Sequence, residues 1–289
     1  MKIRNCKLKI VIFTDLDGTL LDHMTYSFDE ARPALNKIKE TETPIVFVTS
    51  KTFAEVEAIQ KEMGIWGIEP FIVENGGAVF LPKRLFEEKV IEGAKSEGDF
   101  FVIKFGKPYR EVRGVLKETA EAVNLEIRGI GDMTAEEFAE QTGLTLEQAG
   151  RAKKRQFQEG FKILVPKEEQ KEAQEKIKAE IEKRGFHISI GGRFCQIMGS
   201  PSKIKAVETL INLFEKKYGE IHTVGLGDAQ ADLEFIELCD EGFLVKNPKK
   251  AVGAEVESEK IHLVKEIGPA GWNEVVLEAL KEKDLRFRI

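Results

Sequence analysis

Residues 10–19 read Ile-Val-Ile-Phe-Thr-Asp-Leu-Asp-Gly-Thr, and this stretch decides the fold. Its apolar run at 10–13 has the length and β-branched character of a buried strand, and Asp15 and Asp17 follow directly. Ligands of an open α/β sheet bind at the carboxyl ends of its strands. A strand that delivers two carboxylates there can use one for nucleophilic attack and the other for proton transfer. The stretch therefore predicts a catalytic site at the edge of an α/β sheet.

The residues that follow continue an alternation of helices and strands. An amphipathic segment at 28–40 precedes a β-branched run at 44–48, and a third apolar run at 71–73 ends in the turn formers Glu74-Asn75-Gly76-Gly77. Parallel strands need helical crossovers of this kind. The N-terminal part therefore reads as one half of an open α/β sheet.

The pattern changes in the middle of the chain and then returns. The middle block contains a predicted strand at 101–105 and further strands and helices in an α+β order. After Gly199 the sequence predicts a helix over 202–217 and a buried strand over 221–226. We therefore predict a Rossmann-like doubly wound parallel-sheet core, formed by residues 1–84 and 197–289, with an inserted α+β cap domain at residues 85–196.

Composition excludes several classes of protein. The 289 residues are 42% hydrophobic and 33% charged, with a formal net charge of -6, so the basic excess expected of a nucleic-acid-binding protein is absent. No apolar stretch reaches the length of a membrane span, and the run near the N-terminus is too short for a signal peptide. Three scattered cysteines do not suggest a disulfide framework. We expect a cytoplasmic protein that binds neither nucleic acid nor membrane.

Four motifs occur in a fixed order along the chain. They are Asp15-Leu16-Asp17-Gly18-Thr19 after the first strand, Thr49 after the second, Lys203 at a helix start, and Gly227-Asp228 with Asp232 four residues later. Together they resemble the motifs of the haloacid dehalogenase superfamily. One departure is Ala231, where many members of that superfamily carry Asn.

The resemblance implies a phosphatase mechanism with Mg²⁺ as cofactor. Asp15 would be the nucleophile that forms an aspartyl phosphate, and Asp17 the general acid and then the general base. Thr49 and Lys203 would hold the transferring oxygens. Asp15, Asp228 and the backbone carbonyl of Asp17 would hold the metal, with Asp232 orienting its ligands. Hard oxygen ligands of this kind suit Mg²⁺.

The inserted block resembles the cap of phosphatases that act on phosphorylated sugar acids, in particular on mannosyl-3-phosphoglycerate. This resemblance rests on Val48-Thr49-Ser50-Lys51-Thr52, on the turn at 74–77, on the segment 155–161 and on Gly191-Gly192-Arg193-Phe194. It implies hydrolysis of mannosyl-3-phosphoglycerate to phosphate and mannosylglycerate, a compatible solute. The substrate-binding residues would then be Lys51, Asn75, Arg155, Glu159, Gly192 and Arg193.

Other functions stay open at this point. The chain could be a related capped phosphatase that acts on glucosyl-3-phosphoglycerate, sucrose phosphate or phosphoglycolate. A sugar phosphomutase would use the same pair of aspartates, and a regulator that binds sugar phosphates could keep the fold. Arg155 and Glu159, four residues apart, could also form a salt bridge on a helix surface instead of binding substrate. The oligomeric state is not predicted.

Overall fold

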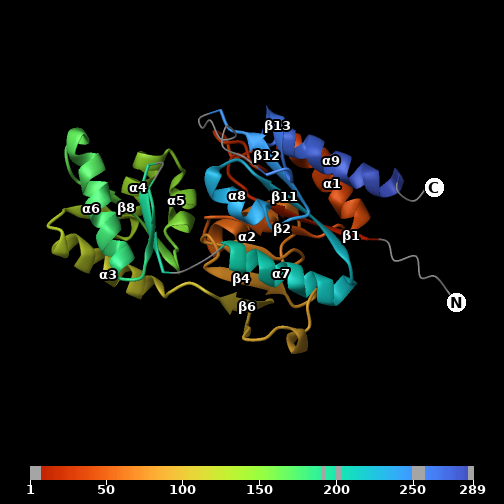
Figure 1. Ribbon diagram of the computed structural model, residues 1–289, viewed down its shortest axis with the longest axis horizontal. Helices are drawn as coiled ribbons and strands as arrows, with labels where there is room; N and C mark the ends of the chain where they lie inside the picture. Colours follow the sequence, from red (N-terminus) through yellow and green to blue (C-terminus); the bar gives the residue numbers. More distant parts are fainter. Residues whose placement is uncertain (1–7, 191–192, 200–202, 249–257, 286–289) are drawn as a thin grey trace.

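A computed structural model describes residues 8–190, 193–199, 203–248 and 258–285. The protein consists of two bodies built around two separate β-sheets (Figure 1). The larger body contains both ends of the described chain, and the smaller body contains helices α3 to α6. Among the described helices, none combines the length and the apolar character needed to cross a bilayer.

The larger body is built on a nine-stranded sheet in the order β13-β12-β11-β1-β2-β3-β4-β6-β5. The strands from β13 to β3 run parallel to their neighbours, and β4, β6 and β5 pair antiparallel. Their bounds are β1 (Lys9–Thr14), β2 (Ile45–Val48), β3 (Phe71–Val73), β4 (Ala78–Pro82), β5 (Lys95–Glu97), β6 (Phe100–Lys104), β11 (Ile221–Gly227), β12 (Glu241–Lys246) and β13 (Ile261–Ile267).

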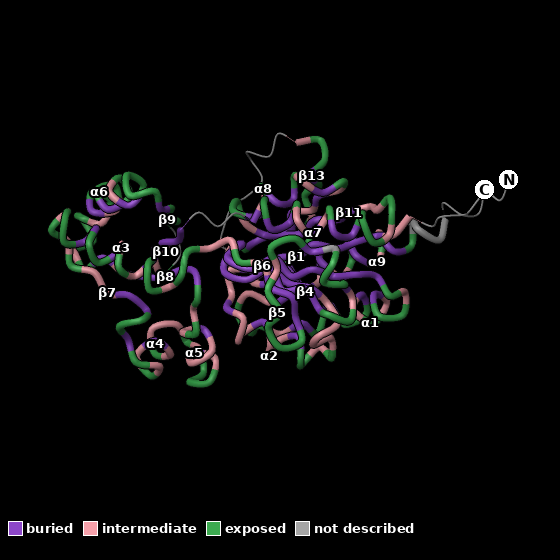
Figure 2. Tube along the Cα trace, turned by 90° about the horizontal axis from the view of Figure 1, so that it is seen from below, coloured by how far each residue is buried: buried purple, intermediate pink, exposed green. Residues whose placement is uncertain are grey.

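Helices cover both faces of this sheet, because the side chains of a strand alternate between its faces. In β1, Ile10 and Ile12 enter one apolar cluster, and Val11 and Phe13 enter the other. The first cluster lies under α1 (Arg32–Thr41), α2 (Phe53–Met63) and α9 (Ala270–Leu285), and the second lies under α7 (Lys203–Tyr218) and α8 (Gln230–Ile236). Figure 2 shows the buried residues concentrated along the central strands. The predicted doubly wound core is confirmed.

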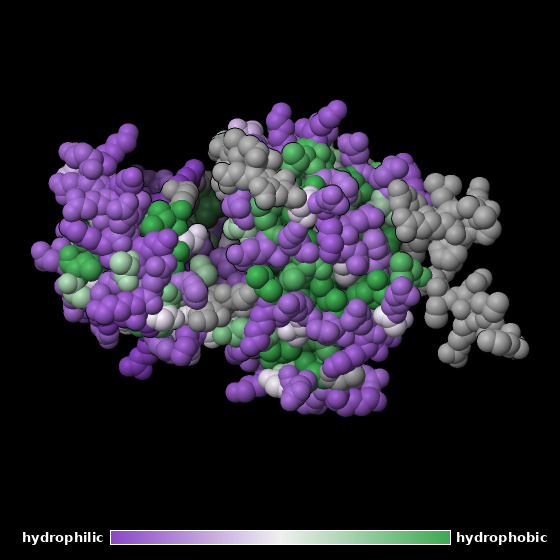
Figure 3. Space-filling view, in the orientation of Figure 1, coloured by the Kyte–Doolittle hydropathy of each residue, from purple (hydrophilic) through white to green (hydrophobic). Residues whose placement is uncertain are grey.

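The smaller body has an α+β architecture. Its antiparallel sheet has the order β7-β8-β10-β9 and packs against helices through an apolar cluster of its own. The elements are α3 (Tyr109–Ala122), β7 (Ile127–Gly129), α4 (Ala135–Thr142), α5 (Leu146–Ala152), β8 (Gln158–Ile163), α6 (Gln170–Lys183), β9 (His187–Ser189) and β10 (Cys195–Met198). Short 3₁₀ helices are η1 (Asp29–Ala31), η2 (Glu88–Val90), η3 (Ile130–Asp132) and η4 (Lys167–Glu169). Hydrophilic residues cover most of the visible surface of this body (Figure 3).

The predicted boundary at residue 85 differs from the observed strand pairing. The strand predicted at 101–105, which corresponds to β6, was expected in the cap, yet β6 pairs antiparallel with β4 along the nine-stranded sheet. The local pattern of a strand does not specify its partner, because pairing depends on segments distant in the chain. We therefore propose that the inserted domain begins after β6 and ends before α7.

The two bodies are joined by a buried contact at Phe157, just before β8. Its ring belongs to the apolar core of the larger body and is 4% exposed. A Cβ atom on Gly77 or on Gly106 would lie 2.7 Å from Phe157, so both glycines leave room for the ring. Beside it, the buried carboxylate of Glu74 accepts backbone N–H groups of Gln156 at 2.8 Å and of Phe157 at 2.8 Å. The segment that enters β8 is therefore anchored to the core.

Candidate active site

The carboxyl ends of β1, β2 and β11 bring three predicted motifs together. Asp15 follows β1, Thr49 follows β2, and Asp228 follows β11. Because β1 pairs with β11 on one side and with β2 on the other, these side chains share one edge of the sheet. The backbone N–H of Asp15 donates to the carbonyl oxygen of Leu226 at 2.9 Å, which extends the pairing to the site itself.

Gly18 allows the loop after β1 to approach Asp228, which follows β11. Its φ of +86° lies in the left-handed region, and a Cβ atom there would lie 2.4 Å from Oδ2 of Asp228. Any other residue would therefore combine backbone strain with a clash against a carboxylate. The glycine in Asp-x-Asp-Gly-Thr thus leaves room for the carboxylate of Asp228 against the loop after β1.

Three carboxylates form a compact buried cluster. One oxygen from each of Asp15, Asp228 and Asp232 lies within 4.8 Å of the others. Burial, followed by the negative charge of Asp232, raises the pKa of Asp15 well above its usual range, and Lys203 only partly opposes this rise. Such crowding of negative charge is relieved by a bound cation. The donor set, which consists of hard oxygen atoms, fits Mg²⁺.

Lys203 provides a positive charge at the edge of this cluster. It is the first residue of α7, and its Nζ lies 2.7 Å from Oδ1 of Asp232 and 4.0 Å from Oδ1 of Asp15. Burial alone would lower the pKa of Lys203, but the neighbouring carboxylates outweigh it and the pKa is raised. The ammonium group therefore stays charged beside Asp15.

Asp232 links the ammonium group of Lys203 to the backbone at Asp228 and Ala229. Its Oδ2 accepts the N–H of Ala229 at 3.1 Å and that of Asp228 at 3.3 Å, while Oδ1 pairs with Lys203. The carboxylate therefore holds the loop that presents Asp228. This geometry is compatible with the orienting role that the resemblance implies.

Two positioning contacts could not be predicted from the sequence. The side-chain amide of Asn247, after β12, donates to Oδ2 of Asp228. It supplies a hydrogen bond near the site although Ala231 replaces the usual Asn. From α9, Nε1 of Trp272 donates to Oγ1 of Thr14 at 3.0 Å, and Thr14 donates in turn to the carbonyl oxygen of Asp15 at 2.7 Å. The only sequence signal was that Asn247 lies between a strand and Pro248.

Lys51 connects Asp17 to the loop after β2. Its Nζ lies 2.9 Å from Oδ1 of Asp17 and 3.8 Å from Oε1 of Glu55, and its backbone N–H donates to Oγ1 of Thr49 at 3.2 Å. Burial would lower the pKa of Lys51, but Asp17 and Glu55 overcome this effect and raise it. The side chain of Lys51 is therefore a permanent cation next to Asp17.

Tyr26 lies beside Lys51 and is also affected by a residue of the smaller body. The Nζ of Lys51 lies 4.9 Å from the centre of the Tyr26 ring. Burial and the charge of Asp17 raise the pKa of Tyr26, whereas Lys51 and Arg193 oppose the rise. Arg193 of the smaller body, which also donates to the carbonyl oxygen of Thr142, thus affects the pKa of a residue of the larger body.

Neither Arg155 nor Glu159 lies on a helix. Arg155 lies between α5 and β8, and Glu159 lies within β8, so the alternative of a salt bridge on a helix surface is wrong. The fully buried carboxylate of Glu159 accepts the hydroxyl of Tyr109 at 2.6 Å and the N–H of Gly131 at 2.8 Å. It therefore belongs to a network inside the smaller body. Its contact with substrate stays a prediction.

Arg155 and Asn75 lie near the junction of the two bodies. Nε and Nη1 of Arg155 are buried and have no hydrogen-bond partner among the described residues. The amide nitrogen of Asn75 donates to Oε1 of Gln158 at 2.9 Å and approaches Oε1 of Gln196 at 3.4 Å. Gly192, the remaining predicted substrate residue, lies outside the described residues.

Comparisons with known proteins agree with this arrangement. A sequence profile of the haloacid dehalogenase-like hydrolases matches residues 12–258. A glucosyl-3-phosphoglycerate/mannosyl-3-phosphoglycerate phosphatase of Persephonella marina is 42% identical over 94% of this chain and 98% of that protein. The protein of the same name from Methanococcoides burtonii is 39% identical over the same shares. A mannosyl-3-phosphoglycerate phosphatase of Pyrococcus furiosus is 32% identical over 86% of this chain and 96% of that protein.

Solved structures share the fold at lower identity. The sucrose-phosphatase of Synechocystis, determined with sucrose and phosphate, superposes with a TM-score of 0.59 at 12% identity, over 96% of this chain and 98% of that one. A phosphatase of the same superfamily from Bacteroides thetaiotaomicron has a TM-score of 0.59 at 18% identity over 98% of each chain. The match of the family profile to most of the chain, together with relatives of up to 42% identity over nearly their whole length, shows that the chain belongs to the haloacid dehalogenase-like hydrolases and is a phosphatase.

Proposed function

We propose that this phosphatase removes the phosphate from hexosyl-3-phosphoglycerates, both from the one that carries mannose and from the one that carries glucose. The observation that carries the proposal is the identity of 39% and 42% to two phosphatases named for both substrates, over 94% of the chain. The aligned 94% of the chain includes the smaller body as well as the nine-stranded sheet and its motifs. The relative named for the mannosyl ester alone is 32% identical.

The reaction proceeds in two displacements at phosphorus. A carboxylate oxygen of Asp15 attacks the phosphorus, the bond to the glycerate oxygen breaks, and Asp17 gives its proton to the departing oxygen. The carboxylate of Asp17 then takes a proton from water, which attacks the aspartyl phosphate and releases inorganic phosphate and free Asp15. Asp17 thereby returns to its protonated form for the next turnover.

The surrounding residues position the phosphoryl group and neutralise its charge. The hydroxyl of Thr49 and the ammonium group of Lys203 are the donors assigned to the phosphoryl oxygens. Asp15, Asp228 and the backbone carbonyl of Asp17 would hold the Mg²⁺. When bound, this ion supplies positive charge that lets an anionic nucleophile and an anionic ester approach each other. Arg193 is assigned to the glycerate carboxylate, because a guanidinium group recognises a carboxylate by paired hydrogen bonds.

A substrate panel tests this proposal. Phosphate release is measured with mannosyl-3-phosphoglycerate, glucosyl-3-phosphoglycerate, sucrose phosphate, phosphoglycolate and 3-phosphoglycerate. We expect kcat/KM for the two hexosyl-3-phosphoglycerates to exceed the others by about 100-fold. Phosphoglycolate and 3-phosphoglycerate lack the hexose hydroxyl groups, and sucrose phosphate lacks the glycerate carboxylate. A preference for any other member of the panel would contradict the proposal. A requirement for a bisphosphate activator with little phosphate release would indicate a phosphomutase.

Removal of one metal ligand is expected to weaken metal binding. Asp228→Asn takes away a charged ligand, so both the Mg²⁺ concentration for half-maximal activity and the Mg²⁺ concentration that raises Tm should increase by at least about tenfold. Glu234→Gln, an exposed change on α8, is the matched control and should behave as the wild type. Wild-type Mg²⁺ dependence of both activity and Tm in Asp228→Asn would show that the metal is held elsewhere.

A further inference from the structure

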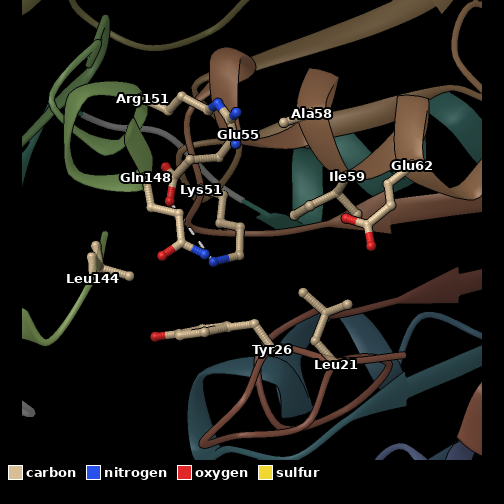
Figure 4. Close-up of a pocket in the computed structure, with 10 residues that line it drawn as sticks. All are labelled: Leu21, Tyr26, Lys51, Glu55, Ala58, Ile59, Glu62, Leu144, Gln148 and Arg151. Carbon is tan, nitrogen blue, oxygen red and sulfur yellow. Dashed lines mark ion pairs between the residues drawn. The ribbon is translucent and has the colours of Figure 1, made fainter. Parts of the chain in front are cut away.

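A pocket lies between the two bodies, directly beside the candidate active site (Figure 4). Tyr26 and Leu21 of the larger body lie on one side of it, and Glu55 and Arg151 lie on the other. The smaller body contributes Arg151 and Gln148 from α5 and Leu144 from the loop before it. The pocket is therefore complete only when the smaller body is in place.

One residue that lines the pocket, Lys51, contacts the proposed proton donor. The Nζ of Lys51 lies 2.9 Å from Oδ1 of Asp17. A group seated there is thus close to the leaving oxygen of the ester. In a hexosyl-3-phosphoglycerate the phosphate is on the C3 oxygen and the hexose is on the C2 oxygen, on adjacent carbons. The hexose must therefore lie next to the oxygen that Asp17 protonates.

The lining combines an aromatic face with several hydrogen-bonding groups. Pockets for small ligands commonly have apolar and aromatic walls with a few well-placed polar groups. The ring of Tyr26 offers an apolar face to the C–H groups of a sugar and a hydroxyl at its edge. A hexose has the matching character, because it carries hydroxyl groups around a ring of carbon atoms.

Some of these polar groups have donors left for a ligand. Oε1 of Gln148 accepts the N–H of Thr145 at 2.9 Å as part of a helix cap, and the amide nitrogen of Gln148 is a separate donor. Arg151 pairs through Nη2 with the exposed carboxylate of Glu147. A guanidinium group has five N–H donors, so this ion pair leaves donors for a ligand. Glu55, by contrast, accepts the N–H and the hydroxyl of Thr52 and is committed to capping α2.

The backbone holds Tyr26 and Arg151 in place. Tyr26 has a φ of +59°, which is unusual for a bulky residue, and its N–H donates to the carbonyl oxygen of Asp22 at 2.9 Å. Strained residues of this kind often occur at functional sites. The carbonyl oxygen of Arg151 accepts the hydroxyl of Thr52 at 3.0 Å, which ties α5 to the start of α2. Both walls of the pocket are thus anchored to the larger body.

We propose that this pocket is the subsite for the hexose of the substrate, with Tyr26 as the sugar platform and Arg151 as a hydroxyl donor. The inference rests on the proposed function and assigns it a specificity site. It places the hexose contacts on residues other than Glu159, whose buried carboxylate accepts hydrogen bonds from Tyr109 and Gly131 inside the smaller body. The hexose is then bound by residues from both bodies.

The test compares two substrates that differ only in the hexose. Arg151→Ala and Tyr26→Ala are assayed with mannosyl-3-phosphoglycerate and with 3-phosphoglycerate, which keeps the phosphate and the carboxylate. We expect Arg151→Ala to lower kcat/KM for the hexosyl ester by roughly 10- to 150-fold and to change that for 3-phosphoglycerate less than about threefold. Tyr26→Ala also removes the ring beside Lys51, so it should lower kcat/KM for both substrates, and for the hexosyl ester by the larger factor. The constant for inhibition by mannosylglycerate, the product without phosphate, should rise in parallel.

The control is Glu147→Ala, which breaks the same surface ion pair and leaves the guanidinium group of Arg151 intact. Glu147→Ala should keep the wild-type ratio of kcat/KM for the hexosyl ester to kcat/KM for 3-phosphoglycerate. Equal losses on both substrates, or no loss on either, would overturn the hexose subsite. A failure of the proposed function is recognised separately, because the wild-type enzyme would then show no preference for the hexosyl ester over 3-phosphoglycerate.

Discussion

Asp15→Asn should abolish turnover, with a loss in kcat of at least about 10⁴-fold. The amide of Asn is nearly isosteric with the carboxylate but is a poor nucleophile, so no aspartyl phosphate forms. Loss of a nucleophile can reach about 10⁶-fold in other hydrolases. The measurement is phosphate release with mannosyl-3-phosphoglycerate at saturating Mg²⁺. Retention of more than a few per cent of the wild-type activity would contradict the mechanism.

The same change should leave the fold intact and raise its stability in the absence of metal. Burial and the neighbouring carboxylates hold the pKa of Asp15 well above its usual range, so its ionisation in the folded state is unfavourable. A neutral amide removes that repulsion, and Tm measured in chelator should therefore increase. Asp29→Asn, at an exposed position outside the site, is the control for both measurements and should match the wild type.

Asp17→Asn should slow turnover of the hexosyl ester by about 10²- to 10⁴-fold, the usual contribution of general acid and base catalysis. The effect should depend on the leaving group. An aryl phosphate with an acidic phenol needs no proton on its departing oxygen, so its first displacement should stay fast. The second displacement still lacks the base, and the phosphorylated enzyme should accumulate.

Rapid mixing with 4-nitrophenyl phosphate distinguishes these steps. We expect a burst of nitrophenol that equals the enzyme concentration, followed by slow steady release. The absence of a burst, together with an equal loss on both substrates, would show that Asp17 has a role other than proton transfer. Lys51 lies 2.9 Å from Asp17 and would be the first neighbour to examine in that case.

The elements of the core could be predicted because their signals are local. Alternation along β1 places Ile12 and Phe13 in clusters on opposite faces, which the apolar run already indicated. The capping box of α5 follows from Thr145 and Gln148, three residues apart. The pairing of β6 with β4 has no such local signal, and for that reason the cap was expected to begin too early.

The candidate site likewise contains residues that the sequence predicted and contacts that only the structure revealed. The order of the motifs and their resemblance to the haloacid dehalogenase superfamily led to the prediction of Asp15, Asp17, Thr49, Lys203 and Asp228. The contacts of Asn247 and Trp272 were not predictable, because each donates to a residue far away in the chain. The sequence likewise did not reveal that Glu159 is enclosed by Tyr109 and Gly131.

By itself, then, the amino-acid sequence determined the strand and helix periods and the turn at Gly18, because these depend on neighbours within a few residues. Its motifs also predicted which carboxylates react. The tertiary structure alone decided which buried donors meet those carboxylates, which sheet β6 joins, and which residues of α5 face Tyr26 across the pocket. The physical reason is that hydrogen bonds and packing act over a few ångströms in space. Residues distant in the chain reach that range only after the sheets have formed and the two bodies have come together.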